Sequence, residues 1–363
     1  MKVSYVVLTL LLYSNPVLVN AHAISYKLNG GRLGDCIYSF CLAKWLAYKY
    51  KIPFYYIPFK GVDDFSIGLY EKRLTKEVGR KFKKVISIHA ERDLASYLKK
   101  EKQQALFLVH FHAAIDVPRE IEETDQLMVR KVGTNWIYLL MKKHPSFEAE
   151  IKRDVQLRKK PQPFNLPKRM ITMAVHVRKG GGFDAPQDSS QYVSKHGHFR
   201  IASDRVHPLK FPPEQYYVDQ ITKVSDMLDN MPIFACIFTD DPSPELLIER
   251  FEQKIKRPNI KFICAQSGHN AFQENILDDV YQMSRFDCLI KSSSHFAWVS
   301  QLMGAHKIIV YPQLSEWDKV NKMISIVKVG IFFNEGHKKG VIYMPFASLK
   351  EGHQKMARHL FAA

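Results

Sequence analysis

Residues 24–58 read ISYKLNGGRLGDCIYSFCLAKWLAYKYKIPFYYIP, and the order of apolar and glycine-rich segments in this stretch indicates the class of fold. The short run at 24–28 predicts a strand, and a glycine-rich turn follows at 29–34. Residues 35–51 carry apolar side chains at helical spacing, and residues 52–58 again predict a strand. Strand, glycine turn, helix and strand in this order predict a β-α-β unit.

Lys44 interrupts the apolar face of the first helix. After this unit, strands and helices continue to alternate up to residue 311. Apolar runs predict strands at 84–89, 105–110, 170–177, 233–239, 260–263, 288–291 and 307–311, and we expect the last of these to be the final strand. Periodic segments predict helices at 125–143, 214–228, 244–254, 278–284 and 294–303. Because strands alternate with helices, we expect an α/β fold whose mostly parallel sheets carry helices on both faces.

The length of 363 residues predicts two domains, at about 150 residues for each. Residues 158–167, RKKPQPFNLP, combine three prolines with a run of positive charge and predict a linker. We therefore expect an N-terminal domain over 24–165, a C-terminal domain over 166–335 and a C-terminal tail over 336–363.

The first 23 residues resemble a signal peptide. Lys2 precedes an apolar run at 3–12, and Ala21-His22-Ala23 offers a small-x-small cleavage site. An uncleaved anchor and an N-terminal core strand are the alternatives. The prediction is export or a secretory-pathway lumen, with no stable membrane span after signal removal; a misread core strand would make the chain cytoplasmic.

The formal net charge of +17 favours anionic partners or, more simply, a soluble surface with scattered lysines. No zinc-finger spacing or RNA-recognition pattern is present, so we expect no nucleic-acid partner. The five cysteines form no CxxC pair, and their odd number argues against a disulfide framework.

The turn at 30–35, GGRLGD, is the first candidate site. It lacks the residues of a P-loop and the spacing of a dinucleotide fingerprint. Glycines allow close approach of the backbone to a ligand, and the following helix N-terminus favours negative charge. We expect Asp35 to be the N-cap of that helix. A plain turn with a cap is the alternative.

The second candidate follows the strand at 170–177 and reads HVRKGGG over 176–182. Arg178 can offer a bidentate fork to a phosphate, and amides of the glycine loop can add donors. His176 can position a phosphate or a sugar hydroxyl. The alternatives are a buried, hydrogen-bonded histidine and a surface ion pair of Arg178.

Two further candidates also lie at strand ends, where open parallel sheets bind ligands. Asp240 and Asp241 follow the strand at 233–239 and suit ribose hydroxyls or a base edge, or else a turn before a helix. The serines at 292–294 precede a helix and suit a phosphate, or else simple N-capping.

Four segments together resemble the alpha-1,2/alpha-1,6/protein O-fucosyltransferase superfamily, and the first looks closest to bacterial alpha-1,6-fucosyltransferases of the nodulation type. They occur in the family's order over 24–312 and read GRLGDCIYSFCLAKWLAYKYKIP, VHVRKGGGFD, FTDDP and LIKSSSHFAWVSQLMGAHKIIVYP. The resemblance implies a GT-B fold, in which two Rossmann-like domains face each other across a cleft. It also implies GDP-fucose as donor substrate, held mainly by the C-terminal domain, with no metal and no other cofactor.

The resemblance also assigns roles to matching positions. Arg178 would bind the diphosphate with support from His176. The other implied substrate-binding residues are Asp240 and Asp241 on the nucleoside side, Ser293 and Ser294 on the phosphates, and Gly31, Gly34 and Asp35 from the opposing domain.

One position departs from the family pattern, because glycines at 180–182 replace the acidic residue often found after the arginine. Asp184 or Asp188 could serve as the catalytic base instead. The implied reaction is metal-independent in-line transfer of the sugar to a hydroxyl of a glycan or glycoprotein acceptor. Another nucleotide-sugar GT-B transferase and a non-catalytic glycan-binding protein are the alternatives.

Overall fold

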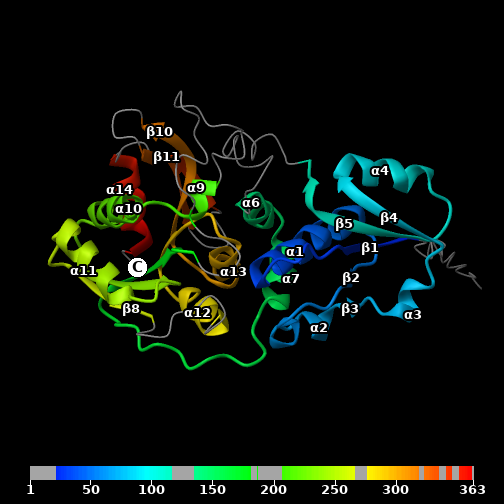
Figure 1. The fold of residues 1–363 in the computed structure, drawn as a ribbon, viewed down its shortest axis with the longest axis horizontal. Coiled ribbons are helices and arrows are strands. Elements are labelled where there is room, and N and C mark those ends of the chain that lie inside the picture. The colour runs from blue at the N-terminus through cyan, green and yellow to red at the C-terminus, as the bar shows by residue number, and fades with distance from the viewer. Residues whose placement is uncertain are drawn as a thin grey trace, which may run out of the picture.

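The computed structural model describes residues 22–116, 135–180, 186, 207–265, 276–318, 323–334, 341–345 and 351–361. Two α/β units lie side by side, each built on its own main sheet, with helices α1, α6, α7 and α13 between the sheets (Figure 1). Both sheets are wholly or mostly parallel. The predicted fold class is therefore confirmed.

The first sheet has the order β1-β5-β4, and all its pairs are parallel. Its strands are β1 (His22–Tyr26), β5 (Ala105–Ala114) and β4 (Lys84–Ala90). Helix α1 (Leu33–Tyr50) packs on β1 and β5, as the β-α-β pattern requires. Helix α4 (Glu91–Lys100) connects β4 to β5.

The strand expected at 52–58 is only two residues long. β2 (Tyr55–Tyr56) pairs with β3 (Lys72–Arg73) in a separate small sheet and reaches β1 through a bridge between Ile24 and Phe54. The two prolines of IPFYYIP lack the amide hydrogen that a longer ladder needs. The other described elements of this half are η1 (Val62–Asp64), α2 (Ile67–Tyr70), α3 (Lys76–Gly79), α6 (Asn135–Lys143) and α7 (Pro145–Asp154).

The second sheet has the order β12-β11-β10-β9-β6-β7-β8. Its parallel strands are β6 (Ile171–Val177), β7 (Ile233–Thr239), β8 (Ile260–Cys264), β9 (Cys288–Lys291) and β10 (Ile308–Asp318). The expectation that the strand at 307–311 is the last is wrong. β11 (Met323–Asn334) and β12 (Val341–Pro345) follow and pair antiparallel, because Ile331 and Phe333 bury the far end of the same apolar face.

Helices cover both faces of the second sheet. Successive side chains of β6 point to opposite faces of the sheet. Met173 and Val175 therefore belong to one apolar cluster, and Ala174 belongs to the cluster on the other face. On one face lie α10 (Glu214–Met227), α11 (Pro244–Ile255) and α14 (Glu351–Phe361). On the other lie side chains of α6 and α12 (Ile276–Met283).

The order of the parallel strands contains a reversal point. From β6 the chain builds outward through β7 to β8, then returns to add β9 and β10 on the opposite side of β6. In open α/β sheets, ligands bind outside the carboxyl ends of the strands at such a reversal. The fold therefore directs attention to the ends of β6 and β9.

Helix α13 (His295–Met303) joins the two units, because it follows β9 yet packs on α1. Its Trp298, Val299 and Leu302 belong to the apolar cluster of the first unit. The predicted linker is fixed as well: Gln282 of α12 accepts from the amide of Phe164 at 3.0 Å and donates to the carbonyl of Gln162 at 2.5 Å.

The predicted signal peptide lies almost wholly at 1–21, outside the described residues. Its last two residues, His22 and Ala23, belong to β1 and pair with Ala105 and Leu106. In the part of the chain that the structure describes, no helix is long and apolar enough to cross a membrane.

Candidate active site between the two units

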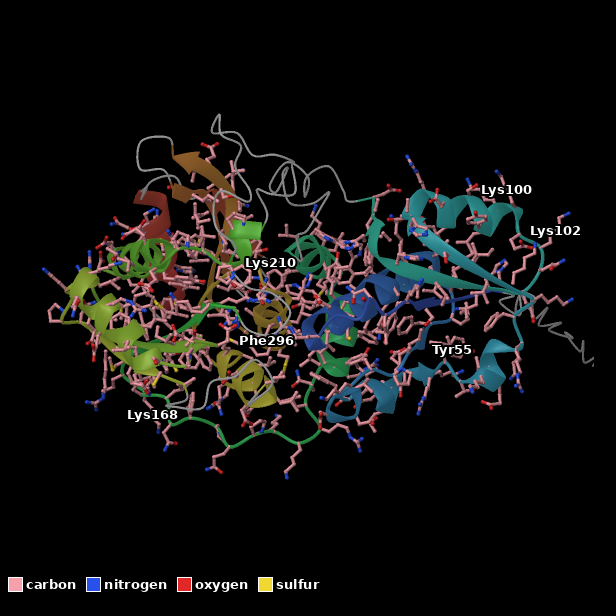
Figure 2. The ribbon with its side chains drawn as sticks, in the orientation of Figure 1. Tyr55, Lys100, Lys102, Lys168, Lys210 and Phe296 are labelled. Carbon is pink, nitrogen blue, oxygen red and sulfur yellow. The ribbon has the colours of Figure 1, made fainter. Side chains whose placement is uncertain are left out.

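The site is built where several element ends meet. The carboxyl ends of β6 and β9 come from the second sheet, and the N-termini of α1 and α13 meet beside them. The short helix α9 (His207–Lys210) contributes Leu209, whose carbonyl accepts from the Ser293 amide at 2.8 Å. Figure 2 shows Lys210 and Phe296 in the middle of the molecule, between the two sheets.

Arg178 directly follows β6, at the reversal point of the sheet. Its guanidinium carbon lies 4.9 Å from the centre of the Phe211 ring. Contact with an aromatic ring restrains a guanidinium, and the planar fork of N–H donors suits two oxygens of a phosphate. Arg178 thus has the position and chemistry that the sequence predicts for it, and its role stays a prediction.

The loop after Arg178 is held by Asp240. The amide of Lys179 donates to Oδ1 of Asp240 at 2.6 Å, and the amide of Gly180 lies 3.3 Å and 3.2 Å from its two oxygens. Gly180 has φ of +102°, a conformation that favours glycine. The amide of Gly180, one of the glycine-loop amides expected to face a phosphate, thus binds a carboxylate of the chain itself, together with the amide of Lys179. Asp240 therefore ties the end of β7 to the loop after β6.

Asp241 and Ser294 make the local contacts of turns and caps. Oδ1 of Asp241 accepts from the amide of Ser243 at 2.9 Å, directly before α11. The hydroxyl of Ser294 accepts from the amide of Phe296 at 3.2 Å as the N-cap of α13. Asp241 therefore stabilises a turn and Ser294 caps a helix, as the alternative readings expect. That these two residues contact a nucleotide stays a prediction.

His176 is a buried, hydrogen-bonded histidine, 7% exposed, with Nδ1 3.3 Å from the hydroxyl of Ser292. Burial, aided by the charges of Arg178 and Lys291, lowers its pKa to about 3. A neutral imidazole at this position can donate or accept a hydrogen bond without adding charge.

Lys291 is a functional candidate that the sequence reading missed. It ends β9 opposite His176 and is only 1% exposed. Its Nζ lies 5.9 Å from the centre of the Tyr311 ring. The available signal was a lysine closing the apolar run CLIK, since a lysine is rarely so buried without a specific reason. Two cationic residues therefore stand on adjacent strand ends, Arg178 just after β6 and Lys291 at the end of β9.

The expectation that Asp35 is an N-cap is wrong. Arg32 occupies the cap position, without a side-chain cap bond, and Asp35 lies in the first turn of α1. Its Oδ1 lies 2.5 Å from Nδ1 of His295, which is 260 positions away in the sequence. Burial raises the pKa of Asp35, but the bond and charge of His295, with the charges of Lys210 and Arg32, outweigh it and lower that pKa below its usual value.

The glycines of the first motif allow this meeting of helices. A Cβ atom on Gly34 would lie 2.7 Å from backbone atoms of His295 and Phe296, so α1 approaches α13 more closely than any larger residue permits. A Cβ atom on Gly31 would lie 2.2 Å from Oδ2 of Asp35. The three residues Gly31, Gly34 and Asp35 thus gather at the junction of the two units.

Asp184 and Asp188, the two expected candidates for the catalytic base, lie outside the described residues. The surroundings of Cys36 disfavour the thiolate that a nucleophile requires. Burial raises the pKa of its thiol to about 11, and its Sγ donates to the carbonyl of Gly31 at 3.6 Å. All five cysteines are free thiols.

The buried histidines predict that acid destabilises the fold. Mainly because of burial, the pKa is lowered to about 3 for His176 and about 4 for His306, below the ~6.5 of an unfolded histidine. Between those values the unfolded chain binds protons that the folded chain does not, so these two histidines contribute less stability as pH falls from 7 to 5. The buried Asp279, whose pKa is raised to about 7, contributes the opposite change. We expect a slope approaching ~1.4 kcal/mol per pH unit for each histidine, measured by chemical denaturation. Between pH 7 and pH 5, His306→Gln should lose about 2 kcal/mol less stability than the wild type, and an unchanged pH dependence in the variant would contradict the prediction.

A scan of protein-family models and a search of curated proteins found no match for this chain. Among solved structures, it is similar to a mutant of FUT1 from Arabidopsis thaliana in complex with GDP, at 12% identity, 84% coverage of this chain, 78% of that chain and a TM-score of 0.43. It is similar to POFUT1 in complex with GDP-fucose, at 12% identity, coverages of 79% and 95% and a TM-score of 0.40. It is also similar to the fucosyltransferase NodZ from Bradyrhizobium, at 12% identity, coverages of 86% and 98% and a TM-score of 0.36. These matches are fucosyltransferases, like the family that the motifs resemble.

Proposed function

We propose that this chain is a glycosyltransferase that takes its sugar from a GDP-sugar, with GDP-fucose as the leading donor. The observation that carries the proposal is the pair of cationic residues Arg178 and Lys291 on adjacent strand ends, at the reversal point of a parallel sheet. Ligands of open α/β sheets bind at such a reversal point, and two positive charges there suit the negative charge of a diphosphate. The four motifs that resemble the fucosyltransferase superfamily support the choice of donor.

In the proposed reaction the acceptor hydroxyl of a glycan or protein attacks the anomeric carbon of the donor in line with the leaving diphosphate. Negative charge grows on the diphosphate as its bond to the sugar breaks. Arg178 stabilises that charge through two N–H donors, and Lys291 adds a second positive charge. The serines after β9 lie at the N-terminus of α13, which favours an anion in the same place.

A nucleotide panel tests the donor class. The full chain is heated alone and with GDP, UDP or CMP at equal concentrations, and the midpoint of thermal unfolding is measured. GDP should stabilise most, by about 2.7 kcal/mol at 100 times its dissociation constant. No stabilisation by any of the three would contradict the proposal, and a larger shift with UDP or CMP would assign a different donor.

A further inference from the structure

We propose, on the basis of the function proposed above, that His295 is the general base of the transfer reaction and that Asp35 positions it. The pair joins the two units: Asp35 lies in the first turn of α1 and His295 is the first residue of α13. His295 comes two positions after Ser293, at the end of β9 where the diphosphate is proposed to bind.

The hydrogen bond fixes which nitrogen of His295 can accept a proton. The lowered pKa of Asp35 keeps its carboxyl ionised, and an ionised carboxylate can only accept. Nδ1 of His295 must therefore carry the hydrogen that it donates to Asp35. In the neutral imidazole this leaves the lone pair on Nε2, which has no hydrogen-bond partner among the residues that the structure describes. The side chain is 20% exposed, so the ring can be reached from outside.

Aromatic neighbours hold the ring in place. Tyr38 stacks on His295 with centroids 4.9 Å apart and an interplanar angle of 21°, and Phe111 meets it edge-on at 5.5 Å. Both rings come from the first unit, from α1 and β5. With Nδ1 bound to Asp35 as well, the direction of Nε2 is set by the surroundings, as a positioned base requires.

The dyad is also close to the proposed donor site. The ring of Phe296, the next residue after His295, lies 5.7 Å from the ring of His176, and His176 is two positions before Arg178. The positive charge of Lys210 helps to lower the pKa of Asp35, and the ring of Phe211, the residue after Lys210, contacts Arg178. One group of side chains therefore connects the diphosphate end of the site to the dyad.

Nε2 of His295 takes the proton of the acceptor hydroxyl while the acceptor oxygen forms its bond to the anomeric carbon. The bond between that carbon and the diphosphate oxygen breaks, and its electron pair leaves on GDP. The imidazolium is stabilised by the charge of Asp35 and then releases its proton to solvent.

GDP release from GDP-fucose, with water as the acceptor, tests the dyad without knowledge of the natural acceptor. His295→Ala in the full chain should lower kcat by at least ~100-fold while the Kd for GDP changes by less than about twofold. Added imidazole should restore part of the rate, which a purely structural role would not allow. Asp35→Asn should lower kcat by at least ~10-fold, since the amide can still accept from Nδ1 but lacks the charge.

His89→Ala is the matched control, because His89 is an exposed histidine on β4 of the first sheet, and it should keep the wild-type rate. If the wild type releases GDP from GDP-fucose and the kcat of His295→Ala is within about twofold of the wild-type kcat, the proposed dyad is wrong and the proposed function still stands. A slow His295→Ala variant with weakened GDP binding and no rescue by imidazole also overturns it. A wild-type chain that neither binds GDP nor releases it from GDP-fucose overturns both proposals.

Discussion

Arg178→Ala is expected to lower the rate of sugar transfer by about 100- to 1,000-fold, the usual effect of removing one group that stabilises charge in a transition state. The guanidinium stands at the reversal point of the second sheet, and its contact with Phe211 restrains its plane. Removing it leaves the negative charge on the departing diphosphate without its bidentate donor. Because Arg178 is only half-buried, the loss should appear in kcat and not in the yield of folded protein.

The measurement is single-turnover release of GDP from GDP-fucose, with thermal unfolding as the check on the fold. Arg178→Lys should recover part of the lost rate, since it keeps the charge but not the planar fork. Arg80→Ala removes an exposed arginine that follows α3, and it should behave as wild type. Near-normal turnover by Arg178→Ala would remove the main support of the proposed function.

Apolar runs predict the central parallel strands of the second sheet well, because β6, β7 and β9 are buried on both faces. β6, for example, is fully buried along its seven residues, and MITMAVHV shows this as a continuous apolar run. The sequence does not predict β11, because MISIVKVGIFFN begins with partly exposed residues and only the stretch at 329–333 is buried. The strand at 52–58 was overestimated because apolar composition alone does not reveal where proline ends a ladder.

The motifs could be found from the sequence, but their contacts could not. Arg178 lies at a strand end, as its glycine-rich surroundings predict. The bond between Asp35 and His295 joins residues 260 positions apart, and it depends on the close packing of α1 against α13 at Gly34. A short motif likewise gives no sign that Asp240 binds the loop after β6. Long-range partners follow from how the two units pack, which local pattern does not contain.

Lys44 illustrates a charge whose meaning changes in the fold. In the sequence it interrupts the apolar face of α1, and in the structure its side chain is 4% exposed. Its Nζ forms ion pairs with Asp154, with Glu71 at 2.5 Å and with Glu150 at 3.3 Å, and the side chain of Asp154 is fully buried. Burial lowers the pKa of Lys44, but these carboxylates outweigh it and raise that pKa, so the lysine is charged. The cluster ties α1 to α7 and to the segment after α2.

Lys44→Met is therefore expected to destabilise the fold by clearly more than the ~1 kcal/mol of a surface ion pair, because it leaves Oδ2 of the buried Asp154 without its cation. The other oxygen of Asp154 keeps the Arg153 guanidinium at 2.7 Å. Chemical denaturation of the full chain gives the free energy of unfolding. Lys84→Met is the matched control: it removes a half-exposed lysine that pairs with Glu101 at 2.8 Å, and the cost should stay under about 1 kcal/mol. Equal costs for the two variants would mean that the buried cluster contributes no more than a surface ion pair. The difference between them measures what burial and the additional carboxylates add to a lysine ion pair.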